Sequence, residues 1–227
     1  MHILTTEELS ALRKISSPTI ANAIETFEVR HRGEGYTHRG VHCLFPGREA
    51  MLGYACTAMI LSGHPAAPNR LVDRTKYWEY TKRAPSPKIS VVQDLSEKPL
   101  GAYFGEVNAS IHLALGSSGV ITNGTVRDIP EVLAAGFQVF AGGVSVSHGF
   151  AHLEDFNRPV QVFGMMVQSG DLIHADQHGA VVIPQAIARE IAAAAQKIER
   201  EERVMIELCR SDSFSVAKLD GLISPEY

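Results

Sequence analysis

The 227-residue sequence predicts a single mixed α/β domain. Short β-branched segments alternate with segments of helical periodicity along the whole chain, and neither an internal repeat nor a low-complexity tract interrupts that alternation. Hydrophobic residues make up 45% of the chain and charged residues 20%, as in ordinary globular proteins. A chain of this length buries enough apolar surface to fold without disulfides or structural metals.

Charge and cysteine content exclude several classes of function. The net charge of −4 and the isoelectric point near 6.2 provide no basic surface for DNA or RNA, although a local positive site could still bind a small anion. The three cysteines, Cys43, Cys56 and Cys209, form no CxxC pair, so we expect reduced thiols in a cytoplasmic protein. No apolar run approaches the ~18 residues of a membrane span, and residues 1–9 do not resemble a signal peptide.

The first half of the chain predicts helices at its start and then two strands. Residues 6–26 form one or two helices, because the run from Thr5 to Glu8 supplies a cap and an acidic first turn, and Pro18 suits the start of a second helix. Residues 52–61 and 89–94 have the composition of buried strands. Two excursions separate these elements: 28–50, a loop or irregular strand pair, and 62–88, with a short helix over 73–80.

The second half alternates more clearly. Helices are expected at 105–115, at 129–135 and, opened by Pro184, at 184–210, the first two closed by Gly116 and Gly136. A strand over 119–122 is expected to stop at Asn123-Gly124, a strong turn signal. The remaining predicted strands are 137–141, 160–167, and a hairpin of 172–175 and 180–183, whose turn Asp176 and Gly179 would make.

The segment from Glu106 to Asp128 contains the residues best suited to ligand binding and catalysis. Glu106 begins a helix, whose free N–H groups on Val107 and Asn108 could hold a carboxylate. After the helix and a strand, the Arg127 fork could grip the same carboxylate, and Asp128 could hold a divalent cation that polarises a ketone. These three devices suit carbon–carbon cleavage next to a 2-oxo acid. An Arg-Asp pair near a turn is usually a solvated ion pair or a helix cap, so the spacing alone predicts only an α/β domain with a small-molecule site.

The run from 105 to 141 resembles a known family, which contains 4-hydroxy-4-methyl-2-oxoglutarate aldolase and the regulator of ribonuclease activity A. That family carries an acidic residue, twenty intervening positions and then Arg-Asp, a spacing that Glu106, residues 107–126 and the pair Arg127-Asp128 reproduce. The run 170–184 is similar to the family's closing hairpin. With weaker matches near residues 22–24 and 53–57, the resemblance covers most of 10–210.

This resemblance implies a fold and an assembly. The fold would be a three-layer β/β/α sandwich of the swivelling type, forming one domain over residues 1–227 with the two excursions and the C-terminal helix as described. The assembly would be a homotrimer or a pair of trimers.

The resemblance also implies roles for individual residues. Arg127 would bind the carboxylate of the 2-oxo acid, Asp128 would ligate Mg²⁺ or Mn²⁺, and Glu106 would move a proton through water. The amides of Val107 and Asn108 would complete the pocket. An acidic residue of a neighbouring subunit's last helix would approach the metal's waters, with Glu202 the first candidate and Glu199 the second; a solvated helix face is the alternative for both.

The expected function is therefore a metal-dependent (class II) aldolase or decarboxylase acting on small 2-oxo acids. One alternative is a non-catalytic regulator that binds a larger enzyme such as a ribonuclease. Another is a lyase or hydratase acting on a sugar-derived acid, because the second excursion offers four side chains that could read a longer substrate: Arg70, Arg74, Tyr77 and Trp78.

Three departures from the family pattern concern the substrate more than the chemistry: residues 98–104 before the acidic helix start, the excursion 62–88, and the His-rich loop 147–155. On a helix, His148 and His152 would share a face with Glu154 beyond and could hold a metal, but a loop shaping the pocket mouth or an interface fits the sequence better. Asp94, at a strand end, is either a group supporting the pocket or a turn former.

Overall fold

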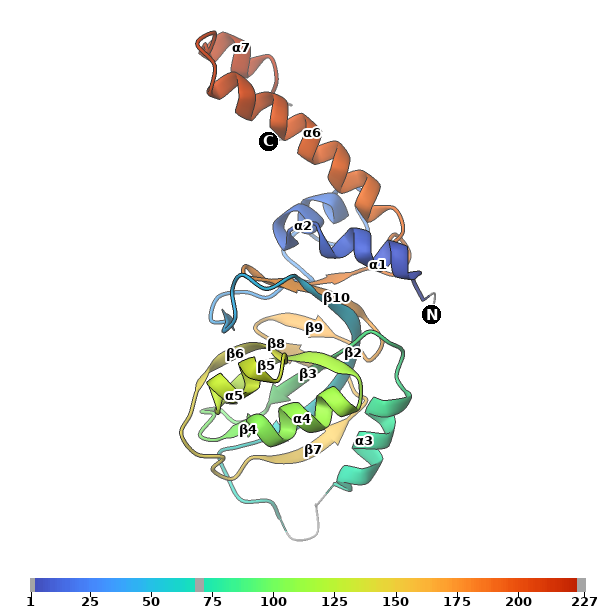
Figure 1. Ribbon diagram of the computed structural model, residues 1–227, viewed down its shortest axis with the longest axis vertical. Helices are drawn as coiled ribbons and strands as arrows, with labels where there is room; N and C mark the ends of the chain where they lie inside the picture. Colours follow the sequence, from blue (N-terminus) through green and yellow to red (C-terminus); the bar gives the residue numbers. More distant parts are fainter. Residues whose placement is uncertain (1–2, 68–71, 224–227) are drawn as a thin grey trace.

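The computed structural model describes residues 3–67 and 72–223, and a nine-stranded sheet forms its centre (Figure 1). The strand order is β1-β6-β5-β3-β2-β10-β11, with β4 beside β5 and β7 beside β2. The strands are β1 (His42–Cys43), β2 (Met51–Leu61), β3 (Lys88–Asp94), β4 (Ala102–Phe104), β5 (Ser117–Val126), β6 (Gln138–Val144), β7 (His152–Phe156), β8 (Val160–Val162), β9 (Met165–Val167), β10 (Leu172–Asp176) and β11 (Gly179–Ile183). The helices are α1 (Thr6–Arg13), α2 (Ser17–Glu25), α3 (Arg74–Arg83), α4 (Glu106–Ala114), α5 (Ile129–Ala134), α6 (Ile191–Cys209) and α7 (Val216–Asp220).

Strands β2, β3, β5 and β6 run parallel, and helices α3, α4 and α5 connect them in turn. The short strand β4 pairs in parallel with the last residues of β5, beyond the point where β3 stops. Carboxyl ends of parallel strands meet at one edge of a sheet, and ligands in such sheets bind outside that edge. The residues that follow β4, β5 and β6 therefore gather in one place.

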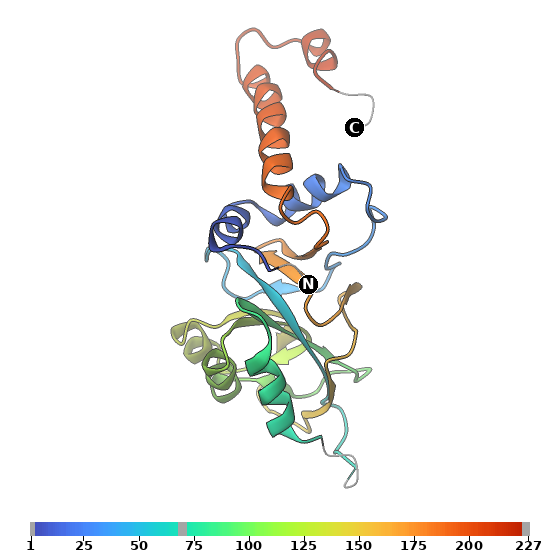
Figure 2. The ribbon, with the colours of Figure 1, turned by 90° about the vertical axis from the view of Figure 1, so that its right-hand side faces the viewer.

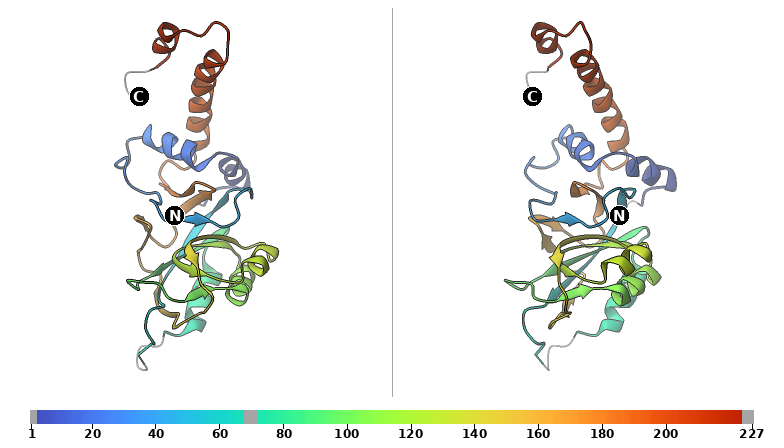
Figure 3. Two further views of the ribbon diagram at one scale, coloured as in Figure 1. Left: turned by 90° about the vertical axis from the view of Figure 1, so that its left-hand side faces the viewer. Right: turned by 60° about the vertical axis from the view of Figure 1, so that its left-hand side comes forward.

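Side-chain alternation along the central strands builds three layers (Figure 3). On one face, Val92, Val120 and Val139 pack against helices α3, α4 and α5. On the other face, the neighbouring residues Val91 and Ile121 pack under the separate hairpin β8–β9. This arrangement confirms the mixed α/β fold predicted from the sequence.

A further core cluster joins the two ends of the chain. Helices α1 and α2 pack with the start of α6 on β2, β10 and β11. Only Ile191 and Ala195 of α6 are buried, and the helix then projects from the body, followed by α7 (Figures 1 and 2). The predicted cap of the first helix is present, because Thr5 and Glu8 exchange side-chain-to-backbone hydrogen bonds.

The strand predicted to stop at Asn123-Gly124 does not stop there. β5 continues to Val126. At Asn123 the side chain, in place of the backbone, makes the hydrogen bonds to β3. Its Oδ1 accepts from the Asp94 N–H at 2.7 Å and its Nδ2 donates to the Asp94 carbonyl at 2.9 Å. The pairing of β5 with β6 shifts register between Thr122 and Thr125, so an Asn-Gly pair here marks a bulge instead of a turn.

Other boundaries also differ from the prediction. The strand expected over 160–167 is the hairpin β8–β9, because Phe163 and Gly164 adopt positive φ angles of 49° and 81°, as a tight turn between antiparallel strands requires. The helix expected from Pro184 begins at Ile191, and turns fill the residues between. The short elements β4, β7 and α7 are not predicted by the sequence pattern.

No helix within residues 3–67 and 72–223 is both long and apolar enough to cross a membrane.

Candidate functional site

Arg127 and Asp128 directly follow β5 at the edge where the parallel strands end. The Arg127 N–H donates to the Phe104 carbonyl of β4 at 2.9 Å. On the other side, the Ser145 N–H after β6 donates to the Val126 carbonyl at 3.0 Å. Asp128 has a left-handed backbone, with φ of 54°, which turns the chain sharply into α5. Three neighbouring strands thus position the Arg-Asp pair.

The Asp128 carboxylate lies at the start of α4, although 22 positions separate it from Glu106 in sequence. Its Oδ2 accepts the Glu106 N–H at 3.1 Å, which satisfies one of the free amides of the helix start. A Cβ on Gly105 would lie 2.4 Å from that same oxygen, so a larger residue before the helix would displace the Asp128 carboxylate. The absence of a side chain at Gly105 therefore leaves room for the Asp128 carboxylate against the first turn of α4.

The guanidinium of Arg127 keeps its terminal nitrogens free. Its Nε lies 3.6 Å from Asp128 Oδ2, the two side chains are 37% and 38% exposed, and no described residue accepts a hydrogen bond from either Nη. In the part of the chain that the structure describes, the N–H groups of Val107 and Asn108 also have no acceptor. A two-pronged cation and two helix-start amides are thus available to an anion at this edge.

An open depression of about 310 Å³ lies beside the pair. Its lining residues are Arg127, Asp128, Ile129, Val144, Ser145 and Val146. The last four of these residues are not among the site residues predicted from the sequence. The signal that could have identified Val144, Ser145 and Val146 is their position, since they lie at the end of β6 and directly after it, beside β5 in the parallel sheet.

The donor set for a metal is small. No group of three or more His, Cys, Asp or Glu side chains that could hold a metal occurs among residues 3–67 and 72–223. Asp128 Oδ1 has no hydrogen-bond partner among these residues, while Oδ2 is bound to the Glu106 amide. Mg²⁺ commonly keeps several waters and takes only one or two carboxylates from the protein, so this single oxygen fits a water-rich site but not an all-protein cage.

The alternative metal pair of His148 and His152 is not formed. His152 lies in strand β7, and both of its ring nitrogens have partners, with Nε2 2.7 Å from Glu154 Oε1 and Nδ1 2.6 Å from the Phe150 carbonyl. His148 lies on an exposed loop. The less favoured alternative of a shared helical face is not found, because residues 145–151 form a loop and His152 begins a strand.

Asp94 is a turn former with a buried carboxylate. It is 2% exposed; Oδ1 accepts from the Ser96 N–H at 2.9 Å and Oδ2 from the Ser62 hydroxyl at 2.5 Å. Asp176 makes the expected hairpin turn through the His178 N–H at 2.9 Å and also accepts the Ser17 N–H at 2.8 Å, which joins the hairpin to α2.

Of the four side chains proposed to read a longer substrate, the three that the structure describes do not form one surface. Tyr77 is fully buried in the core under α3, so it cannot contact a ligand, and Trp78 packs partly against the same core. Arg74 begins α3 on the exposed side, and Arg70 lies outside the described residues.

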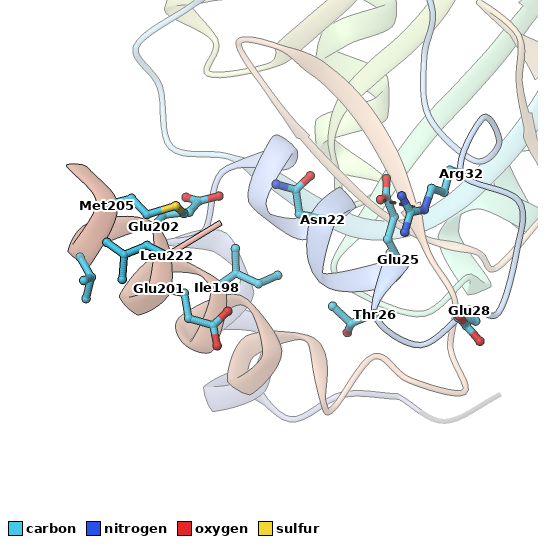
Figure 4. A pocket seen from close by; sticks show the side chains of 11 residues that line it. Asn22, Glu25, Thr26, Glu28, Arg32, Ile198, Glu201, Glu202, Met205 and Leu222 are labelled. Atoms are coloured by element: carbon cyan, nitrogen blue, oxygen red, sulfur yellow. Dashed lines mark ion pairs between the residues drawn. The ribbon is translucent and has the colours of Figure 1, made fainter. Parts of the chain in front are cut away.

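Glu199 and Glu202 lie on α6, which projects away from α4 and α5 (Figures 1 and 2). Glu202 lines a separate groove of about 780 Å³ between α2 and α6, where Glu25 and Arg32 also contribute (Figure 4). Within one chain, neither glutamate is brought to the Arg-Asp pair.

Comparisons with known proteins agree with this fold. A family model described as "RraA-like: Aldolase/RraA" matches residues 17–182. A protein of Halalkalibacterium halodurans, provisionally assigned as a 4-hydroxy-4-methyl-2-oxoglutarate aldolase, is 25% identical over 142 residues, which cover 62% of this chain and 68% of that protein. An uncharacterised protein of Methanocaldococcus jannaschii is 36% identical over 93 residues, covering 40% of this chain and 45% of the relative, so this chain spans less than half of that relative's length.

Two solved structures share the fold. An uncharacterised protein of Pseudomonas syringae superposes with a TM-score of 0.77 at 22% identity, covering 98% of this chain and 96% of that one. A Streptomyces coelicolor protein, described as an unusual member of the RNase ES inhibitor RraA family, superposes with a TM-score of 0.72 at 22% identity, covering 90% and 98%.

Proposed function

The chain belongs to the RraA-like family, and from that premise we propose that it is a metal-dependent lyase that cleaves the carbon–carbon bond next to a pyruvoyl unit. Its reactions would be the aldol cleavage of 4-hydroxy-2-oxo acids, the decarboxylation of oxaloacetate, or both. The observation that carries the proposal concerns groups without a partner among residues 3–67 and 72–223: the Arg127 Nη atoms, the first amides of α4 and one oxygen of the Asp128 carboxylate.

Arg127 binds the substrate carboxylate in this proposal. Two parallel N–H···O bonds from a guanidinium fix both the position and the plane of a carboxylate, and here Nε lies against Asp128 while the Nη atoms face no acceptor within the described residues. The N–H groups of Val107 and Asn108 add the positive end of α4 to the same anion. The 2-oxo group is thereby oriented next to Asp128.

Asp128 would hold Mg²⁺ or Mn²⁺ through Oδ1. When bound, such a cation supplies a Lewis acid for the 2-oxo oxygen, where negative charge develops as the bond breaks. Asp128 keeps its own orientation through the Glu106 amide and the close approach of Gly105.

Glu106 would move the protons through water. In aldol cleavage the C4 hydroxyl loses its proton, the C3–C4 bond breaks, and the electron pair passes to C2–C3 as the enolate of pyruvate. The aldehyde or ketone leaves, and a proton returned to C3 completes pyruvate. In oxaloacetate, carbon dioxide leaves instead and the same enolate is protonated. The Glu106 side chain is exposed at the start of α4, where water can link it to both positions.

We further propose a homotrimer or a pair of trimers in which α6 of one subunit carries Glu202, or else Glu199, to the site of a neighbour. The projection of α6 beyond the body supports this reading. Light scattering coupled to size exclusion would measure the mass. Glu202→Gln should lower kcat, whereas Glu207→Gln on the same exposed helix should not.

The test of the lyase is oxaloacetate decarboxylation with Mg²⁺ or Mn²⁺, with and without EDTA. Arg127→Ala and Asp128→Ala should each abolish most of the activity. The matched control removes a second exposed Arg–Asp pair, Arg158 and Asp155, whose Nε–Oδ2 distance is 3.4 Å. Wild-type rates in either site variant, or metal-independent turnover, would contradict the proposal.

The regulator alternative is favoured by one observation, the apolar side chains exposed along α6 and α7. Val204, Phe214 and Val216 are 52%, 46% and 75% exposed there. A pull-down on candidate enzymes with Asp128→Ala separates the two functions, because docking through this arm would not depend on Asp128.

A further inference from the structure

We propose that the groove between α2 and α6 binds helix α3 of a second copy of this chain, and that repetition of this contact closes the ring of subunits. The inference rests on the proposed function, because it specifies the interface of the homotrimer proposed there. The two contacting faces differ from each other, so the contact is head-to-tail, and such a contact closes into a ring when its rotation allows.

The groove combines apolar and acidic side chains (Figure 4). Its apolar lining residues are Ile198, Val204, Met205 and Leu222, and its acidic ones are Glu25, Glu28, Glu201 and Glu202. The one cationic lining residue, Arg32, is paired with Glu25, with Nε 3.4 Å from Oε2. Among residues 3–67 and 72–223, Glu28 and Glu202 make no ion pair. The groove therefore has an excess of negative charge beside its apolar surface.

Helix α3 has the complementary charge. It is the only one of the helices within the described ranges with a net positive charge, since it holds four cationic side chains and one carboxylate. The carboxylate of Glu79 is paired with Arg83, with Oε2 3.2 Å from Nη2. Arg74 and Lys82 make no ion pair with any residue that the structure describes. These cations are available to carboxylates of another molecule.

The spacing of the basic residues on α3 also suits a groove of mixed character. Arg74, Trp78 and Lys82 are four positions apart, so they follow one side of the helix. Both cations are exposed, and Trp78 is only partly buried. Arginine and tryptophan contribute strongly at protein interfaces, and the methylene stems of Arg and Lys cover apolar surface while their charged ends reach further. This side of α3 can contact the apolar and the acidic groups of the groove together.

The α3 helix of the same chain does not reach the groove. Helices α2 and α6 pack in one core cluster and α3 packs in another. Figure 1 shows α6 at the upper end of the molecule and α3 in its lower part. The basic side of α3 and the acidic groove can thus meet only between two copies, and each copy offers both faces.

This contact would also bring α6 to the neighbour's candidate site. Helix α3 connects β2 to the parallel strand β3, so it begins at the edge of the sheet where the parallel strands end. Burial raises the pKa of Tyr103 in β4 to about 12, and the nearby charge of Arg74 opposes that rise. The first turn of α3 is therefore close to β4, at the edge that holds Arg127 and Asp128, as delivery of an α6 glutamate requires.

Charge reversal tests the contact. Arg74→Glu should weaken each contact about fivefold, and because a trimer has three equal contacts, the concentration of half-dissociation should rise about tenfold. An acidic residue is favourable in the first turn of a helix, so the variant should fold. Glu201→Lys should have the same effect. The double variant Arg74→Glu with Glu201→Lys should recover the wild-type value, whereas Arg74→Glu with Glu207→Lys, outside the groove lining, should not. Light scattering coupled to size exclusion over a dilution series measures the mass.

Cross-linking locates the contact in a ring that does not dissociate on dilution. The background is Cys209→Ser, because Cys209 is exposed on α6. A chain with Arg74→Cys and Glu201→Cys, treated with a short bismaleimide, should give covalent dimers and trimers on a denaturing gel. Glu207→Cys in place of Glu201→Cys provides the matched control, which should give much lower yields.

The outcomes separate this inference from the lyase. A mass that falls for Glu201→Lys but not for Arg74→Glu assigns the groove to another face of the chain and overturns the choice of α3. Equal cross-linking yields for the groove pair and its Glu207 control also overturn it. A monomeric wild type overturns this inference together with the proposed trimer. In all three cases the lyase stands or falls separately, on metal-dependent oxaloacetate decarboxylation by wild type and Arg127→Ala.

Discussion

Replacing Gly105 by alanine should disable the site without unfolding the protein. The backbone of Gly105 is extended, with φ of −142° and ψ of −165°, so alanine adopts it without strain. The added Cβ would nevertheless lie 2.4 Å from Asp128 Oδ2 and 3.0 Å from Arg127 Cγ. The substitution therefore acts on the two side chains that the proposed mechanism requires.

The expected size follows from these distances. Ordinary contact begins at 3.4 Å, so the Asp128 oxygen must retreat by about 1 Å (3.4 minus 2.4) and give up the Glu106 N–H. A misplacement of about 1 Å costs on the order of 100-fold in rate. The free energy of unfolding should change by about 1 kcal/mol or less, because the lost hydrogen bond is exposed to solvent and alanine lowers the entropy of the unfolded chain.

The assay is kcat/KM for oxaloacetate decarboxylation together with urea unfolding of the same samples. Gly143→Ala is the control, since its Cβ would have its nearest neighbour at 4.0 Å, on Thr125, and both measurements should match wild type. A Gly105→Ala enzyme with wild-type kcat/KM would refute the idea that the fit of Asp128 against α4 matters to the activity.

Three other substitutions test the site and the fold. Arg127→Lys keeps the charge but not the fork, so KM for the 2-oxo acid should rise about 10- to 100-fold with folding unchanged, and steady-state kinetics with a KM equal to wild type would contradict carboxylate binding by the guanidinium. Lys88, 2% exposed, donates from Nζ to the Thr81 and Lys82 carbonyls at 2.9 and 3.0 Å and so closes α3; Lys88→Met should cost about 1–3 kcal/mol in urea unfolding, whereas Lys82→Met should cost less than about 0.5. Burial lowers the pKa of His112 and of His174 to about 4, below the ordinary value of 6.5. Between pH 4 and pH 6.5 the unfolded chain therefore binds more protons than the folded chain. The free energy of unfolding is thus highest above about pH 6.5 and falls by about 3 kcal/mol per histidine as the pH drops to 4. Stability measured by urea unfolding across this range should decline less steeply for His174→Gln than for wild type, and equal slopes would show that this histidine does not titrate as its burial requires.

Local chemistry in the sequence was sufficient to predict most of the helices and strands. The capping residues around α1, the closing glycines Gly116 and Gly136 and the final hairpin act over a few residues, and all four predictions are confirmed. Predictions failed where a distant partner decides the conformation. Asn123 continues a strand because it bonds to Asp94 on the next strand, and β4 and β7 are strands only because β5 and β2 lie beside them.

The same division applies to the candidate site. The sequence by itself determined which residues have the chemistry, because an acidic helix start and an Arg-Asp pair can be identified from residue types and spacing. Only the tertiary structure decided that Asp128 Oδ2 meets the Glu106 amide, that a side chain at position 105 would displace the Asp128 carboxylate, and that Val144 and Val146 line the depression beside Arg127. These contacts depend on the parallel order of β4, β5 and β6, and strand order is set by packing across the whole sheet and not by any local run of residues.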